Sequence, residues 1–166
     1  MEKIKWGIIG PGNIANNFAD GLKGSYSGQL VSIASKSEDR RKNFGDKYDI
    51  HPDFRFDSYE DIINSEHIDA IYISTPHTLH AQWTIKAAGK GKHILCEKPG
   101  AINFNEGKKI IDAVREAGVF YMEGFMYRCH PQIPKLVEII KNKMIGDVIS
   151  IDCLLYTSTL PTNGTV

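Results

Sequence analysis

The sequence predicts a doubly wound α/β domain, in which helices cover both faces of a parallel sheet. Apolar segments of strand length alternate along the chain with amphipathic segments of helix length. Several strand segments, such as "IYIST", are apolar on both faces, which is typical of strands buried on both sides. A glycine-containing turn separates the first strand from the first helix.

The elements follow in a regular order. Strands are expected over 4–10, 29–35, 54–56, 68–75, 93–98 and 119–126. Helices are expected over 13–23, 38–48, 59–65, 79–90 and 104–117, and a further helix and strand over 131–144 and 147–152. Ser58 and Asn103 each precede an acidic residue by three positions, which predicts helix N-caps, and Gly118 is expected to end the fifth helix.

Composition excludes several classes of function. The chain has 166 residues, of which 42% are hydrophobic and 24% charged, and its formal net charge is zero. A neutral chain gives no reason to expect a nucleic acid or an acidic membrane as partner. No apolar stretch approaches the roughly 20 residues of a membrane span. Cys96, Cys129 and Cys153 lack paired or metal-like spacing, which favours reduced thiols in a cytoplasmic protein.

The first strand ends in a turn that is suited to phosphate. Gly10, Gly12 and Ala15 form a G-x-G-x-x-A sequence that opens a helix. Gly10 permits the tight turn, Gly12 lets the backbone approach a pyrophosphate, and the N–H groups of Asn13 and Ile14 lie at the helix start. The pattern predicts a Rossmann-type dinucleotide-binding site, and the alternative is a tight turn without a ligand.

The end of the second strand indicates which dinucleotide is bound. NAD-binding domains place an acid there for the ribose 2′-hydroxyl. This chain instead has hydroxyl and cationic side chains, which favour a 2′-phosphate and hence NADP, with NAD as the alternative. Glu38 complicates this interpretation unless it serves only the first turn of the next helix. The residues concerned are Ser35, Lys36, Ser37, Arg40 and Arg41.

The fourth strand ends in "STPHTLH", where the carboxyl ends of parallel strands form a ligand crevice. Ser74, Thr75, Pro76, His77 and His80 are predicted to contact cofactor or substrate. The two histidines could also be ordinary helix-start residues. They are three positions apart, as metal ligands can be, but no third ligand is nearby in the sequence and no metal site is predicted.

The fifth strand ends in "CEKP", which sets Glu97 and Lys98 directly before Pro99. Taken alone, these residues fit a surface ion pair before a turn. Together with "GIIGPGNIA", "STPHTLH" and "EGFMYRCHPQ", however, the chain resembles the glucose–fructose oxidoreductase and inositol dehydrogenase family. It is most similar to the branch with dihydrodiol and xylose dehydrogenases, and the resemblance extends to about residue 152.

This resemblance implies an oxidoreductase that transfers hydride between a nicotinamide cofactor and a hydroxyl or carbonyl carbon of a sugar, polyol or cyclic diol. It implies that Lys98 is the catalytic residue and that Glu97 holds Lys98 or contacts the cofactor. In the family, the peptide bond before the proline that follows this lysine is often cis. It also places Tyr127 and Arg128 near the reactive end of the cofactor, although a polar loop with a structural tyrosine fits them equally well.

The resemblance also sets the expected domains: a dinucleotide-binding domain over 1–127 and the start of a truncated substrate domain over 128–152. Residues 153–166, "CLLYTSTLPTNGTV", depart from the family, and "CLLYTS" is encoded by the end of a common transposon adapter, which suggests a non-native tail. We therefore expect a fragment that binds the dinucleotide only, from a parent that is a homo-oligomer. A non-catalytic redox-sensing module and a methyltransferase remain as alternatives; the second usually has an acid after strand two.

Overall fold

The computed structural model describes residues 2–152, so the predicted non-native tail lies outside the described residues. The described chain divides into two units, the first ending at Phe125 and the second beginning at Met126. The first unit contains the whole sheet, and each unit is described by itself.

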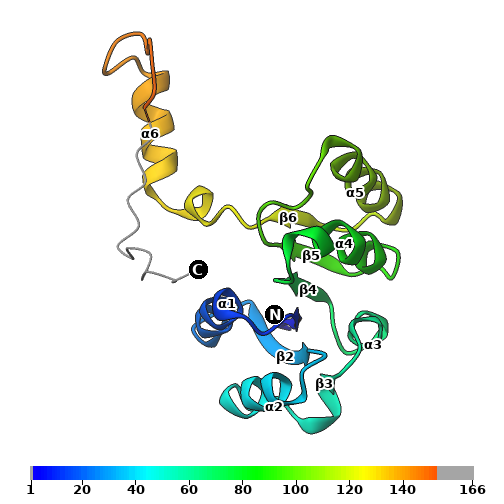
Figure 1. The fold of residues 1–166 in the computed structure, drawn as a ribbon. Helices are drawn as coiled ribbons and strands as arrows, with labels where there is room; N and C mark the ends of the chain where they lie inside the picture. The colour runs from blue at the N-terminus through cyan, green and yellow to red at the C-terminus, as the bar shows by residue number, and fades with distance from the viewer. Residues whose placement is uncertain (1, 153–166) are drawn as a thin grey trace, which may run out of the picture. The chain divides into compact units, whose positions relative to one another are not determined.

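The first unit is built on a six-stranded parallel sheet with the order β3-β2-β1-β4-β5-β6 (Figure 1). The chain starts in the middle, builds outward to β3, returns and builds outward again from β4. The predicted doubly wound fold is therefore confirmed, with its switch point between β1 and β4. The strands are β1 (Ile4–Ile9), β2 (Gly28–Ala34), β3 (Arg55–Phe56), β4 (Ala70–Ile73), β5 (His93–Cys96) and β6 (Tyr121–Glu123).

Helices cover both faces, and neighbouring residues of one strand serve different cores. Ile8 packs in a cluster with residues of the first two helices, whereas Ile9 packs in a second cluster with residues of the third and fourth. Both side chains are fully buried, so a strand that is apolar on both faces is what this position needs. The helices are α1 (Asn13–Lys23), α2 (Glu38–Lys47), α3 (Tyr59–Asn64), α4 (His80–Ala88) and α5 (Phe104–Ala117), with short 3₁₀ turns η1 (Pro52–Phe54) and η2 (His77–Leu79).

The predicted helix caps are confirmed. The Ser58 hydroxyl accepts hydrogen bonds from two N–H groups in the first turn of α3. The side chain of Asn103 accepts from the N–H of Glu106 at 2.9 Å, and Glu106 in turn accepts from the N–H of Ile102. Gly118 ends α5 in the left-handed conformation, with φ 64°, which costs glycine little.

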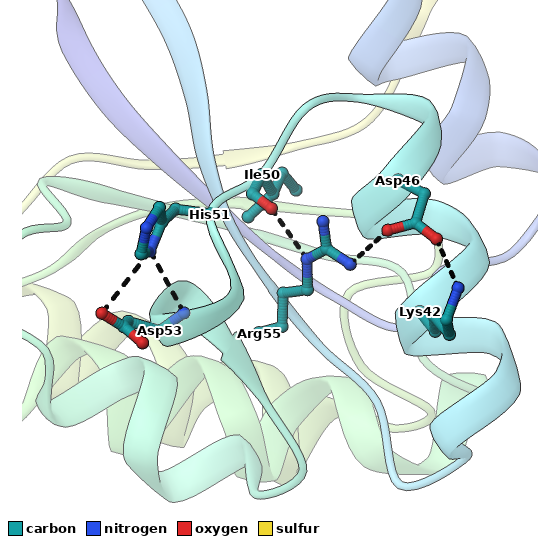
Figure 2. A network of polar contacts seen from close by, with 6 residues as sticks. All are labelled: Lys42, Asp46, Ile50, His51, Asp53 and Arg55. Atoms are coloured by element: carbon teal, nitrogen blue, oxygen red, sulfur yellow. Dashed lines mark hydrogen bonds and ion pairs between the residues drawn. The ribbon is translucent and has the colours of Figure 1, made fainter.

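A polar network joins α2 to β3 (Figure 2). The guanidinium of Arg55 donates to the carbonyl of Ile50 at 2.7 Å and forms an ion pair with Asp46. The Asp46 carboxylate also accepts a hydrogen bond from the Lys42 ammonium at 2.8 Å. These two cations lower the pKa of the Asp46 carboxyl, chiefly through the hydrogen bond from Lys42. A Cβ at Gly45 would overlap the Arg55 side chain, so glycine lets the arginine lie against the helix. The network fixes α2, whose first turns carry Arg40 and Arg41 of the predicted 2′-phosphate site.

The second unit contains η3 (Met126–Cys129) and α6 (Gln132–Lys141). The predicted helix over 131–144 is therefore confirmed over most of its length. The strand expected over 147–152 is wrong, because those residues have no regular structure. A strand needs a neighbour that completes its hydrogen bonds, and the described part of the second unit contains no strand. Between residues 2 and 152, no helix is long and apolar enough to cross a membrane.

The two-sided core allows a direct test of burial. Ile71 on β4 is fully buried, whereas Ile149 in the second unit is 98% exposed. Ile71→Ala should lower the free energy of unfolding by about 2–5 kcal/mol, because it removes buried methyl groups and leaves a cavity. The matched variant Ile149→Ala should change it by less than about 0.5 kcal/mol. Urea unfolding followed by circular dichroism measures both, and equal losses would contradict the described core.

The cysteines of the two units should differ in reactivity. Cys96 on β5 is buried and Cys129 is exposed, and burial raises the pKa of the Cys96 thiol to about 12. Because the thiolate is the reactive form, Cys96 should be almost unreactive at pH 8 in the folded chain. With Cys153 replaced by serine, Ellman's reagent should titrate one thiol in the native chain and two in urea. Two fast native thiols would contradict the burial of Cys96.

Candidate functional site

The candidate site lies at the carboxyl ends of β1 and β4, where the sheet order reverses. Gly10 follows β1 with φ 92°, and a Cβ there would lie 3.0 Å from the carbonyl oxygen of Ser74. The Ser74 hydroxyl donates to the Gly10 carbonyl at 2.7 Å. Glycine is therefore required at this turn both by its dihedral angle and by the backbone that passes beside it.

The N-terminus of α1 is suited to an anion. Among the described residues, no side chain caps this helix and its first turn contains no acid. The N–H groups of Asn13 and Ile14 lie in this first turn, after Gly12. A Cβ on Gly12 would meet nothing within 4 Å, so the space beside the turn is open. Uncapped N–H groups, the helix dipole and open space together fit a phosphate group.

The turn after β2 brings the predicted 2′-phosphate residues together at the start of α2. The Ser35 hydroxyl accepts from the N–H of Ser37 at 3.2 Å, and the Ser37 hydroxyl caps α2 by accepting from the N–H of Arg40. Both hydroxyls can still donate one hydrogen bond. Lys36 and Arg40 are exposed, and the Lys36 ammonium lies 5.9 Å from the ring centroid of Tyr59.

Arg41 has a different position from Arg40. Its guanidinium donates to the Ser35 carbonyl at 2.7 Å, so it supports the turn from within. A separate hollow of about 200 Å³ lies between Pro11 and Asn16 on one side and residues of α2, among them Arg40, on the other. Its lining combines cationic and amide side chains, which are suited to a phosphorylated ligand: Pro11, Asn16, Arg40, Asn43, Phe44 and Lys47.

The residues after β4 divide into exposed and buried groups. Pro76 and His77 are exposed, and Thr75 is 7% exposed with a hydroxyl that has no hydrogen-bond partner among residues 2–152. His80 is fully buried, and its two ring nitrogens lie 2.7 and 2.8 Å from backbone carbonyl oxygens. The direct cofactor contact predicted for His80 therefore has no exposed ring atom to make it. Residues 2–152 contain no cluster of three or more metal-ligating side chains.

The residues after β5 lie at the same edge of the sheet. Lys98 is exposed, takes part in no ion pair among the described residues, and precedes Pro99 through a cis peptide bond. Glu97 does not hold Lys98, because its carboxylate accepts a hydrogen bond from the Tyr72 hydroxyl at 2.6 Å. The Tyr72 ring stacks on Phe18 of α1, with centroids 4.1 Å apart.

Tyr72 is a supporting residue that sequence reasoning missed. Burial, followed by the hydrogen bond to Glu97, raises the pKa of its phenol, so the hydroxyl remains a donor. A buried tyrosine hydroxyl needs a partner, and this was the available clue within the apolar strand.

Tyr127 and Arg128 lie on η3 in the second unit, and their roles stay predictions.

Known proteins match the chain over the same region. Residues 4–125 match the family described as "Oxidoreductase family, NAD-binding Rossmann fold". The chain is 34% identical to trans-1,2-dihydrobenzene-1,2-diol dehydrogenase of Xenopus tropicalis over 146 residues, 87% of this chain and 44% of that protein. It is 34% identical to D-xylose 1-dehydrogenase (NADP(+)) 2 of Haloferax volcanii over 148 residues, 89% of this chain and 45% of that protein.

A solved structure agrees with these relatives. The 3-ketoreductase KijD10 of Actinomadura kijaniata, in complex with TDP-benzene and NADP, has a TM-score of 0.79 and 31% identity. The match covers 87% of this chain and 45% of that one. The chain thus spans less than half the length of these relatives. With its glycine turn, parallel sheet and switch point, the chain belongs to the GFO/IDH/MocA oxidoreductase family and contains that family's NAD(P)-binding Rossmann domain.

Proposed function

We propose that this chain is the dinucleotide-binding part of an oxidoreductase that transfers hydride between NADP(H) and a hydroxyl or carbonyl carbon of a sugar, polyol or cyclic diol. One observation carries the proposal. An exposed Lys98, unpaired by any acid among residues 2–152, stands at the sheet edge that also bears the uncapped N-terminus of α1. The relatives named above act on a diol and a sugar by their names, which supports the substrate class.

The preference for NADP rests on the turn after β2. Two serine hydroxyls and two exposed cations lie where an acid would bind the 2′-hydroxyl of NAD. Glu38 and Asp39 lie in the first turn of α2, where acids complement the helix dipole. The 3-ketoreductase bound to NADP and the NADP-dependent xylose dehydrogenase support the same preference.

The residues of this chain can be assigned roles in such a reaction. The nicotinamide would supply or accept the hydride. The N–H groups of Asn13 and Ile14 would bind the pyrophosphate. In the reduction direction, the Lys98 ammonium would donate a hydrogen bond to the substrate oxygen, stabilise its developing negative charge and give it a proton. In the oxidation direction, the neutral Lys98 amine would accept that proton.

Exchanging one charge should reveal the cofactor preference. Lys36→Asp should weaken NADPH binding about ten-fold or more and leave NADH binding within about two-fold, because a charge-assisted contact is worth about 1.5–3 kcal/mol. The control Lys90→Asp makes the same charge change at an exposed position after α4. Isothermal calorimetry measures all three chains with both cofactors. Equal weakening of the two cofactors, or tighter binding of NADH by the wild type, would contradict the NADP assignment.

The role of Lys98 should be visible in turnover rather than in binding. In a protein that joins this chain to its substrate domain, Lys98→Met should lower kcat about 10²-fold or more, as loss of an acid–base group does. NADPH affinity should stay within about two-fold, because the contact is made in the transition state. Steady-state kinetics on a polyol and aldose panel, with Lys90→Met as control, measures this. A variant that kept a third of wild-type turnover would make Lys98 structural.

A further inference from the structure

His80 is a buried histidine between two turns of the candidate site. It begins α4 and is fully buried. Its Nδ1 lies 2.7 Å from the carbonyl oxygen of Pro99, and its Nε2 lies 2.8 Å from the carbonyl oxygen of Thr75. The ring therefore connects the end of β4 to the turn that carries Lys98.

Both neighbours of this ring are hydrogen-bond acceptors. A backbone carbonyl cannot donate, and a neutral imidazole has one N–H donor and one acceptor nitrogen. In the neutral form, one nitrogen lone pair would face a carbonyl oxygen at under 3 Å. The imidazolium form donates to both carbonyls, so it is the protonation state that this pair of contacts satisfies.

A carboxylate lies at the other end of the same peptide group. The carbonyl of Pro99 and the N–H of Gly100 belong to one peptide unit. Its carbonyl faces His80 at 2.7 Å, and its N–H donates to the carboxylate of Glu123 at 2.7 Å. A cation at the carbonyl and an anion at the N–H both align with the dipole of a peptide unit. The charge of Glu123 would compensate an imidazolium at His80 through this peptide and so reduce the cost of burying it.

The turn has little freedom to move away from these two side chains. Gly100 is buried, and a Cβ there would overlap the hydroxyl of Tyr121. Other groups able to titrate lie on the connected elements: His77 with its ring 5.5 Å from that of His80, and Cys96, Glu97 and Lys98 along β5 and its turn. The Glu97 carboxylate accepts a hydrogen bond from Tyr72, and Cys96 is buried as a thiol. Glu123 is the carboxylate that accepts a hydrogen bond from the Pro99–Gly100 peptide group.

We propose that His80 and Glu123 are positioning residues for Lys98: as imidazolium and carboxylate, they hold the two ends of the Pro99–Gly100 peptide group and fix the turn on which Lys98 stands. The importance of that turn rests on the proposed function of Lys98. The paired charges themselves do not, and they can be tested in this chain without cofactor.

The protonation state of His80 is the first test. In the wild-type chain with ¹⁵N-labelled histidine, long-range ¹H–¹⁵N spectra at pH 7 should show both ring nitrogens of His80 protonated. Triple-resonance assignment of the wild-type chain identifies the ring signals of His80. One unprotonated ring nitrogen in the wild type would overturn the proposal, and this measurement does not depend on any variant folding.

The coupling to Glu123 is the second test, because a merely structural histidine would not show it. Glu123→Gln keeps an acceptor of the same shape and removes the charge, so one ring nitrogen of His80 should lose its proton at pH 7. The control Glu116→Gln removes an exposed charge of α5 and should change nothing. Retention of both protons in Glu123→Gln would overturn the coupling.

The position of the lysine turn is the third readout. In His80→Gln, the carbonyl ¹³C signal of Pro99 and the backbone signals of Lys98 should move, while those of β1 stay in place. The exposed-site control His67→Gln should move none of them. Unchanged Lys98 and Pro99 signals in a folded His80→Gln chain would overturn the proposal. Failure of NADPH to bind would instead count against the proposed function, since these spectra are recorded without cofactor.

Discussion

The close approach of two backbones at the switch point is the constraint on which the rest of the site depends. Gly10 lies so near the carbonyl of Ser74 that a Cβ would be 3.0 Å from it, and the Ser74 hydroxyl bonds back to the glycine turn. This contact aligns the ends of β1 and β4. Along one edge of the sheet then lie the N-terminus of α1, the buried Thr75 and the turn after β5. In domains of this fold, the dinucleotide binds at this edge.

Much of the fold was predictable from the sequence because local chemistry and tertiary structure agree in the first unit. Strands such as β4 are apolar on both faces, and Ser58 and Asn103 cap their helices as their spacing predicts. The segment 147–152 contains Val148, Ile149 and Ile151 and was also predicted as a strand, but it forms none. A pattern can state that a strand is possible, whereas pairing needs a neighbour, and the described part of the second unit does not supply one.

The location of the site was predictable from the sequence, but the role of each polar side chain was less so. Sequence position placed His80 and Glu97 at the strand ends, but it could not show which polar atoms face a ligand and which face the backbone. His80 is occupied by two carbonyls and Glu97 by Tyr72. These partners lie 5 to 25 residues away in the sequence, and tertiary contacts at such separations leave no local pattern. A glycine turn is a local motif, which is why Gly10 was identifiable from its neighbours alone, whereas the role expected of Lys98 came from the family resemblance.

The order of the strands in the sheet has a consequence for how this domain forms. The bond between Ser74 and Gly10 joins residues that are 64 positions apart, so the central strand β1 keeps one edge unpaired until β4 has been synthesised. During that interval β1, β2 and β3 can associate, but the fully buried Ile9 still lacks β4 and α4, whose residues complete its core. Parallel pairings over such distances form slowly and expose apolar edges while they form. The turn of Gly10 and Gly12 is among the first segments to be synthesised. It reaches its final conformation only when the second half of the sheet has folded against it.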